Sequence, residues 1–305
     1  MENTQTLVVK DLTKKYNNNE VLHSISFSCK PGRIVALVGE NGSGKTTIMK
    51  SILGLINSQG EIFLKGEKIS FNKNSSNYTI GSLIEEPAIY PYLSGFDHLR
   101  LFSHNESLDD INHLIKDLNM TQYIHKNSKN YSLGMKQKLG IALAFLNDPA
   151  LIILDEPMNG LDSKATVELR NLILKKSTQG VSFLISSHIL SELQKIANDI
   201  LIIDGGKIIK DTTMTNLLRE SKQFITIKTT DDVMACKYLE QSGYFIKEYA
   251  PLKVAVSSDK SIKHIINLLM ENEIEAIEIS DVSRGEEDLE SSVLDLIYNK
   301  ERVNK

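Results

Sequence analysis

The sequence contains no tryptophan and only two cysteines among its 305 residues. Two cysteines form no metal-ligand spacing and no disulfide framework, which favours a reducing compartment. Basic residues are not in excess, because 35 Lys and Arg stand against 39 Asp and Glu, a net charge of −4. This balance excludes a strongly basic surface that holds nucleic acid through counterion release, although it does not exclude a local basic patch.

Long apolar segments are also missing, since no stretch approaches the roughly 20 residues that a membrane-spanning helix requires. Residues 1–4 lack the basic and apolar regions of a secretion signal. We therefore expect a cytosolic protein that reaches a membrane only through a partner. A hydrophobic share of 41% with 24% charged residues is ordinary for a globular protein, and the length is sufficient for a core.

Several segments predict an α/β fold. Three of them are apolar throughout, as buried parallel strands are: Ile34–Val38, Leu151–Leu154 and Phe183–Ile185. Helical patterns lie between them, at Thr46–Leu55, Leu139–Leu146 and Thr166–Lys175. Serines alternate with apolar residues over 24–29, which predicts a half-buried antiparallel strand. The turn Asp204-Gly205-Gly206 predicts a tight hairpin.

The composition shifts after about residue 220, which indicates a second domain. Its predicted elements are strands at 224–229, 244–249, 252–257 and 275–279, and helices at 231–242, 259–271 and about 286–299. The βαββαβ order predicts a ferredoxin-like α+β domain at 221–305. The first domain is expected to span 1–220, with a helical subdomain at about 80–148.

A glycine-rich segment between the first buried strand and the next helix carries the strongest motif. It reads Gly-Glu-Asn-Gly-Ser-Gly-Lys-Thr over 39–46 and matches the pattern G-x-x-x-x-G-K-[ST]. The glycines let backbone N–H groups converge on phosphates, Lys45 would reach the β- and γ-phosphates, and Thr46 would ligate Mg²⁺. The expected nucleotide contacts are Gly39, Asn41, Gly42, Ser43, Gly44, Lys45, Thr46 and Thr47. The alternative, a glycine-rich turn with a solvated lysine, does not explain why the motif lies directly between a buried strand and a helix.

Two carboxylates, Asp155 and Glu156, follow the second buried strand. Ligands of α/β folds bind at the carboxyl ends of the strands. Because neighbouring side chains of a strand point in different directions, the two can take separate roles. We expect Asp155 to hold Mg²⁺ and Glu156 to act as general base on the attacking water. Taken alone, the pair is equally consistent with a solvated strand end.

These motifs, together with Tyr-Ser-Leu-Gly-Met-Lys-Gln-Lys at 131–138, resemble an ABC-type ATPase, the nucleotide-binding subunit of a transporter, over about residues 5–215. Ser132 and Gly134 match the family's signature loop, whereas Leu133 and Met135 depart from its commonest form. In that family two subunits pair head to tail, and each signature loop closes over ATP held by the other. The resemblance therefore implies a homodimer. Without it, the stretch would be read as an N-capped amphipathic helix.

The resemblance implies roles for further residues. Asp162 lies in a stretch similar to the family's D-loop at the dimer interface, and His188 resembles the switch histidine that contacts the γ-phosphate. Tyr16 falls where the family stacks an aromatic ring on adenine. Glu85 occupies the position of a glutamine that links Mg²⁺ and the attacking water to the membrane subunit, so it is a candidate catalytic residue and metal ligand. If the alignment to the family is shifted by one residue, Glu86 takes this position instead. Without a function, the segment would be an exposed acidic loop.

A glutamate at this position resembles the branch that serves bacitracin- and lantibiotic-type peptide export and self-immunity. The expected function is an ATP-hydrolysing exporter subunit at the cytoplasmic face of the membrane, bound to separate permease subunits, with peptide as cargo and no nucleic acid partner. The segment 87–93 is apolar and aromatic, which fits either buried loop packing or a groove for a permease helix. Alternatives are a soluble ABC ATPase acting on ribosomes or nucleic acid, an importer subunit, and a P-loop kinase or GTPase.

Overall fold

The computed structural model describes residues 5–17, 19–71, 79–104, 107–187, 190–220, 223–256 and 262–281. The chain divides into two compact units, Met1–Met214 and Thr215–Lys305. The division falls at the first residue of α7 (Met214–Glu220), whereas the sequence analysis ends the first domain at the last residue of that helix. The helix expected at about 286–299 lies outside the described residues.

The first unit contains a six-stranded sheet with the order β10-β9-β3-β8-β7-β6. Its strands are β3 (Ile34–Val38), β6 (Ile80–Leu83), β7 (Leu151–Asp155), β8 (Ser182–Ser186), β9 (Asp199–Asp204) and β10 (Lys207–Thr213). All pairs are parallel except the β9–β10 hairpin. Every residue of β3, β7 and β8 is buried, which confirms the prediction made from their uninterrupted apolar runs.

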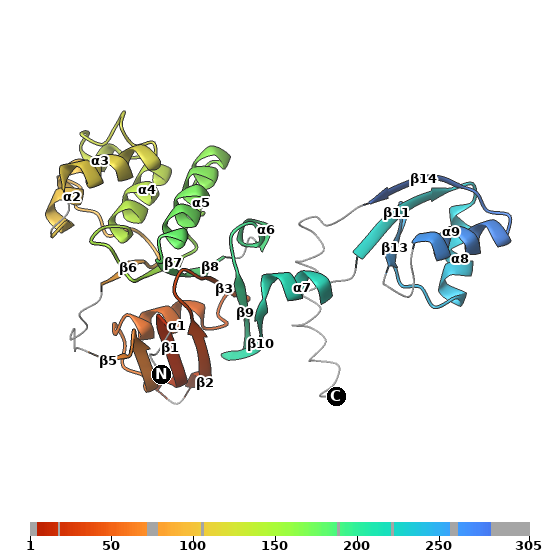
Figure 1. The fold of residues 1–305 in the computed structure, drawn as a ribbon, viewed down its shortest axis with the longest axis horizontal. Helices are drawn as coiled ribbons and strands as arrows, with labels where there is room; N and C mark the ends of the chain where they lie inside the picture. The colour runs from red at the N-terminus through yellow and green to blue at the C-terminus, as the bar shows by residue number, and fades with distance from the viewer. Residues whose placement is uncertain are drawn as a thin grey trace. The chain divides into compact units, whose positions relative to one another are not determined.

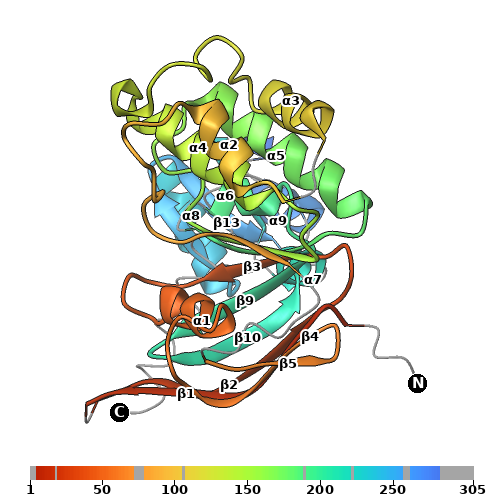
Figure 2. The ribbon, with the colours of Figure 1, turned by 90° about the vertical axis from the view of Figure 1, so that its left-hand side faces the viewer.

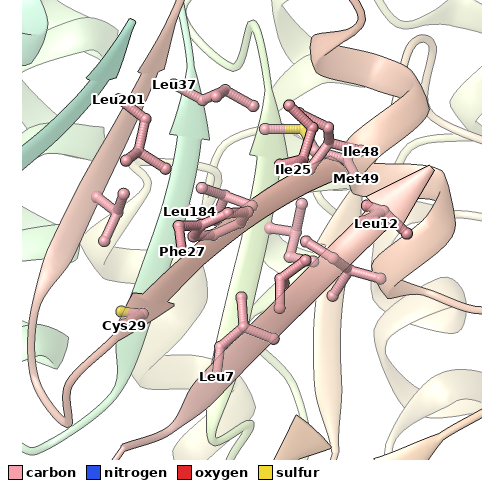
Figure 3. Close-up of a cluster of buried hydrophobic side chains, with 14 of the residues drawn as sticks. Leu7, Leu12, Ile25, Phe27, Cys29, Leu37, Ile48, Met49, Leu184 and Leu201 are labelled. Carbon is pink, nitrogen blue, oxygen red and sulfur yellow. The ribbon is translucent and has the colours of Figure 1, made fainter. Parts of the chain in front are cut away.

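A second, antiparallel sheet of the same unit has the order β2-β1-β4-β5. Its strands are β1 (Leu7–Tyr16), β2 (Asn19–Cys29), β4 (Gln59–Leu64) and β5 (Glu67–Ile69). Helix α1 (Lys45–Ile52) packs between the two sheets (Figure 2). Figure 3 shows the resulting core, in which Leu12, Phe27, Met49 and Leu184 come from β1, β2, α1 and β8. Each such buried side chain contributes roughly 1.5–3 kcal/mol.

Helices fill the interval between β6 and β7. They are α2 (Gly95–Phe102), α3 (Leu108–Asp117), the short 3-10 helix Ser128–Asn130 and α4 (Leu133–Ala144). Figure 1 shows α2, α3 and α4 grouped above the sheets. Helix α4 begins earlier than the predicted start at Leu139, because the Ser132 hydroxyl accepts a hydrogen bond from the Met135 N–H and so caps the helix. After β7 come α5 (Ser163–Thr178) and, beyond β8, α6 (Leu190–Gln194).

The parallel strands bring distant segments of the chain together. Because their carboxyl ends meet at one edge of the sheet, the loop after β3, the residues after β6, the end of β7 and the end of β8 become neighbours there. Helix α1 starts at the same edge, directly after the β3 loop. This edge is where the motifs predict the nucleotide site.

The second unit has the element order β11-α8-β12-β13-α9-β14. The elements are β11 (Gln223–Thr229), α8 (Asp232–Gln241), β12 (Ile246–Tyr249), β13 (Leu252–Val256), α9 (Ile262–Glu271) and β14 (Ala276–Asp281). Its strands form one antiparallel sheet in the order β12-β13-β11-β14. Residues of both helices and of the sheet, among them Ile227, Leu239, Val254 and Leu269, form a separate core. No helix among the described residues of either unit is both long enough and apolar enough to cross a bilayer.

Candidate functional site

A cavity of about 630 Å³ opens at the carboxyl edge of the parallel strands. It has the size of a site for a small organic ligand. Its wall combines the glycine-rich loop, the start of α1, the residues after β6 and β7, and the start of α4. The sequence-predicted residues on the wall are Asn41, Gly42, Gly44, Lys45, Thr46, Thr47, Glu85, Asp155 and Glu156. Segments more than one hundred residues apart therefore form one site.

The glycine-rich loop needs glycine at two positions for its backbone conformation. Gly42 has φ 85° and Gly44 has φ 108°, angles that side-chain-bearing residues rarely adopt. Gly44 is the N-cap of α1, so the free N–H groups and the positive end of this helix face the loop. At Gly39 a Cβ would lie 2.2 Å from the Ile203 carbonyl oxygen, so close packing excludes a side chain there. The loop is thus built to accept an anion.

Lys45 supplies the positive charge of the cavity wall. Its ammonium donates hydrogen bonds to the carbonyl oxygens of Gly39, at 2.7 Å, and Glu40, at 3.0 Å. Burial lowers the pKa of Lys45, because desolvation disfavours the charged form, while Glu156 and Asp155 act in the opposite direction. An anion that enters the loop would offer Lys45 stronger partners than these two carbonyl groups.

The ends of β7 and β8 and the start of α1 are joined by hydrogen bonds to one carboxylate. Asp155 is buried and accepts from the Thr46 hydroxyl at 2.7 Å and from the Ser186 hydroxyl at 2.5 Å. The same Ser186 oxygen accepts the backbone N–H of Glu156 at 2.9 Å. Glu156 has φ 49°, a left-handed conformation that costs about 1 kcal/mol or more for a residue other than glycine. Ser186 therefore fixes both carboxylate-bearing residues.

The donor set fits Mg²⁺ bound together with a polyphosphate. Thr46 and Asp155 offer adjacent oxygen ligands, the type that Mg²⁺ prefers. Among the described residues, no group of three or more His, Cys, Asp and Glu side chains is arranged to hold a metal by itself. The remaining ligands must come from water and from a phosphate. The Ser43 hydroxyl, in the same loop, is buried and has no hydrogen-bond partner among the described residues, but Ser43 is not one of the residues that line the cavity.

Glu85 reaches the cavity from the segment that follows β6. Its backbone is also left-handed, with φ 59°. Its carboxylate forms an ion pair with Lys50 of α1, with 2.7 Å between Glu85 Oε1 and Lys50 Nζ. Sequence reasoning did not identify Lys50. The available signal is helical spacing, since Lys50 lies four residues after Thr46 and therefore on the same face of α1.

Helix α4 forms part of the cavity wall. Leu133 and Gln137, four residues apart, both line the wall. Gln137 is buried and donates from Nε2 to the carbonyl oxygen of Pro157, the residue after Glu156, at 3.1 Å. A Cβ at Gly134 would lie 2.9 Å from the Gly160 carbonyl oxygen, so this glycine allows α4 to approach the loop after β7. Sequence reasoning gave Gln137 no role. Its position four residues after Leu133 indicates that both lie on the same face of the helix.

Comparison with known proteins identifies the family. The family model described as ABC transporter matches residues 22–159. The chain is 38% identical to the lantibiotic transport ATP-binding protein SrtF of Streptococcus pyogenes, over 67% of this chain and 89% of that protein. It is 32% identical to the bacitracin transport ATP-binding protein BcrA of Bacillus licheniformis, over 94% of this chain and 95% of that one. The chain belongs to the ABC transporter family.

A solved structure supports the same assignment. It is described as the ATP binding subunit of an ABC transporter, matches with a TM-score of 0.65 at 30% identity, and covers 70% of this chain and 92% of that chain. The resemblance drawn from the motifs and the ABC ATPase core with its mixed sheet are thereby confirmed. As an ABC transporter ATP-binding protein, the chain binds ATP and hydrolyses it in support of transport.

Several residues predicted from the ABC resemblance are not among the described residues that line the cavity. Ser132 is the N-cap of α4, and Asp162 is the N-cap of α5, where its carboxylate accepts the Ala165 N–H at 2.7 Å. Tyr16 lies at the end of β1, with Lys14 Nζ 4.6 Å from its ring centre. His188 lies outside the described residues. Their contacts with nucleotide remain predictions.

Proposed function

We propose that this subunit powers the export of antimicrobial or amphipathic peptides, for resistance, self-immunity or peptide secretion, through separate membrane permease subunits. The observation that carries the proposal is the similarity to the bacitracin and lantibiotic transport ATP-binding proteins, which in the bacitracin case includes the second unit. Glu85 supports it, because the sequence resemblance links a glutamate at this position to the same branch.

In the proposed ATPase site, the polar groups of the phosphate loop and of the ends of the strands have separate tasks. Lys45, the Ser43 hydroxyl and the N–H groups at the start of α1 bind the phosphates. Thr46 and Asp155 would hold Mg²⁺, which neutralises phosphate charge when bound. Glu156, fixed through its N–H by Ser186, orients the attacking water and accepts its proton.

A second copy of the chain completes the proposed site. Ser132 caps α4 and is exposed, so its hydroxyl and the N-terminus of α4 are available to a partner's nucleotide. Leu133, directly after Ser132, is 65% exposed, and in the proposed dimer it is covered by the partner subunit. In this arrangement each subunit supplies Lys45 and Glu156 to one ATP and Ser132 to the other.

An aromatic surface supports docking of the permease. Tyr90 stacks on Phe102 at 6.3 Å and lies 5.8 Å from Tyr92 between ring centres. Tyr92 is 70% exposed, and Tyr90, Leu101 and Phe102 are exposed as well. Exposed aromatic clusters of this kind suit the centre of a protein interface. We assign this surface to a short helix of the permease, which brings the subunit to the cytoplasmic face of the membrane.

The second unit is proposed to be a ferredoxin-like accessory domain. Its βαββαβ order and its antiparallel sheet β12-β13-β11-β14 support this assignment. The fold alone does not identify its role, because ferredoxin-like domains act as sensors, as dimerisation elements and as packing extensions.

The test is a gene deletion complemented with the wild-type chain or with Glu156→Gln, challenged with bacitracin and with a lantibiotic. We expect the deletion to raise sensitivity to a peptide, the wild type to restore resistance and the variant to fail. Purification in detergent should recover a multi-spanning permease with the wild-type chain. Unchanged sensitivity together with co-purification of ribosomes would refute the exporter proposal in favour of a ribosome-associated ATPase.

A further inference from the structure

The cavity has an excess of negative charge. Its wall carries four carboxylates, Glu85, Glu86, Asp155 and Glu156, and a single ammonium group, that of Lys45, among the described residues. A nucleotide triphosphate brings several more negative charges. Carboxylates that are not neutralised would repel it, since charge interactions are strong where water is partly excluded. The Thr46 and Ser186 hydroxyls stabilise the charge of Asp155. The other carboxylates of the wall need a different source of stabilisation.

Lys50 is a second cation, and it contacts Glu85 of the cavity wall. It lies on α1, four residues after Thr46, and its Nζ is 2.7 Å from Glu85 Oε1. The Lys50 side chain is 30% exposed and that of Glu85 is 62% exposed. The pair therefore joins the helix that carries Lys45 and Thr46 to the segment after β6, across the edge of the cavity.

We propose that Lys50 is a positioning residue that holds Glu85 against α1 and cancels its charge, so that the cavity accepts the triphosphate of ATP. This inference rests on the proposed ATPase site and adds a residue to it. Lys50 acts through Glu85 and not by contact with the nucleotide. Its contribution to ATP affinity should therefore depend on the presence of the Glu85 carboxylate.

The expected effect is moderate, because a partly exposed ion pair is weakened by solvent. We expect Lys50→Met to raise the Kd for ATP about three- to tenfold, since an unpaired carboxylate then faces the phosphates. Lys50→Arg keeps the charge and should stay within about twofold of the wild type. The effect should shrink between about 0.05 M and about 0.5 M salt, because the Debye length falls well below 10 Å.

A double-mutant cycle in the full chain tests the proposal. ATP binding is measured by calorimetry in EDTA, without metal, for the wild type, Lys50→Met, Glu85→Gln and the double variant. In the Glu85→Gln background, Lys50→Met should change the Kd less than about twofold, because the charge to be cancelled is gone. In the background of Glu86→Gln, a matched carboxylate on the same wall, the full effect of Lys50→Met should remain.

The proposal would be overturned if Lys50→Met changed the Kd for ATP equally in the wild-type and the Glu85→Gln backgrounds. It would also be overturned if Lys50→Met changed the Kd in neither background. Lys126→Met, which removes an exposed lysine outside the cavity wall, serves as the control for general charge loss. Thermal melting of each variant verifies that it is folded, and Lys50→Arg provides the comparison if Lys50→Met melts early. Failure of the wild type to bind ATP would refute the ATPase site itself, an outcome distinct from additive effects in the cycle.

Discussion

Ser186 offers the sharpest test of how the proposed hydrolytic residues Asp155 and Glu156 are held. Its side chain is fully buried at 0% exposure at the end of β8. One hydroxyl donates to the Asp155 carboxylate at 2.5 Å and accepts the Glu156 N–H at 2.9 Å. Ser186→Ala removes both hydrogen bonds without adding volume, and it leaves a buried carboxylate oxygen and a backbone N–H without this partner.

The magnitude follows from these two hydrogen bonds. A hydrogen bond to a charged group contributes about 1.5–3 kcal/mol and a neutral one about 0.5–1.5 kcal/mol, so the free energy of unfolding should fall by roughly 2–4 kcal/mol. Glu156 also loses the contact that fixes its left-handed backbone. If loss of the hydrogen bond to the charged Asp155 raises the activation free energy by the full ~1.5–3 kcal/mol, kcat falls about 10- to 150-fold.

Ser182→Ala is the matched control. Ser182 lies on the same strand and is also 0% exposed. Its hydroxyl donates to the Lys30 carbonyl at 3.1 Å and shares a second hydrogen bond with the Thr6 hydroxyl at 2.9 Å. It should lower the melting temperature comparably but leave the kcat for phosphate release near that of the wild type. If both variants retain the same kcat, Ser186 has no role in positioning Glu156 and the reasoning is refuted.

Three further predictions concern the same cavity. Glu156→Gln should bind ATP with near-normal affinity, lose nearly all turnover and accumulate ATP-bound dimers in size-exclusion chromatography; substantial remaining phosphate release would remove Glu156 from the role of general base. Gln137→Met should lower kcat about tenfold with little change in KM, because the Pro157 carbonyl loses its donor, whereas the exposed Gln122→Met should change neither; a shift in KM alone would contradict this. Since burial lowers the pKa of Lys45 and phosphate favours its charged form, ATP binding in alkaline buffer should take up protons, and identical calorimetric heats in buffers of different ionisation enthalpy would contradict this.

The local parts of the site could be predicted from sequence because their geometry is local. Lys45 hydrogen-bonds to Gly39 and Glu40, only six and five residues away, and the left-handed backbone of Gly42 and Gly44 is a property of glycine. The junction of Thr46 with Asp155, 109 residues apart, was predictable for a different reason. Thr46 lies after the buried strand β3 and Asp155 is the last residue of the buried strand β7, and the carboxyl ends of parallel strands share one edge of a sheet.

The sequence patterns did not predict which side chains from different elements form hydrogen bonds or ion pairs with one another. The pairing of Glu85 with Lys50, the hydrogen bond from Gln137 to Pro157 and the double role of Ser186 each depend on which elements face one another at distances of a few ångströms. Apolar periodicity places the start of α4 at Leu139, whereas the helix begins at the Ser132 cap, a start that the sequence analysis gave only as the alternative to a signature loop. The cap hydrogen bond from the Met135 N–H to the Ser132 hydroxyl marks that start, and a polar cap leaves no hydrophobic signal in the sequence.

The sequence by itself determined the phosphate-loop motif and the buried parallel strands, and so predicted a nucleotide site at one edge of a sheet, because both features are encoded by residues close together in the chain. The order of secondary structure in the second unit was likewise readable from its alternating patterns. Only the tertiary structure decided how the carboxylates of the site are neutralised and fixed, by Lys50 for Glu85 and by Ser186 for Asp155 and Glu156. The physical reason is that a charge in a cavity is stabilised by whichever donor the packing brings within hydrogen-bond distance, and that donor has no fixed separation along the chain.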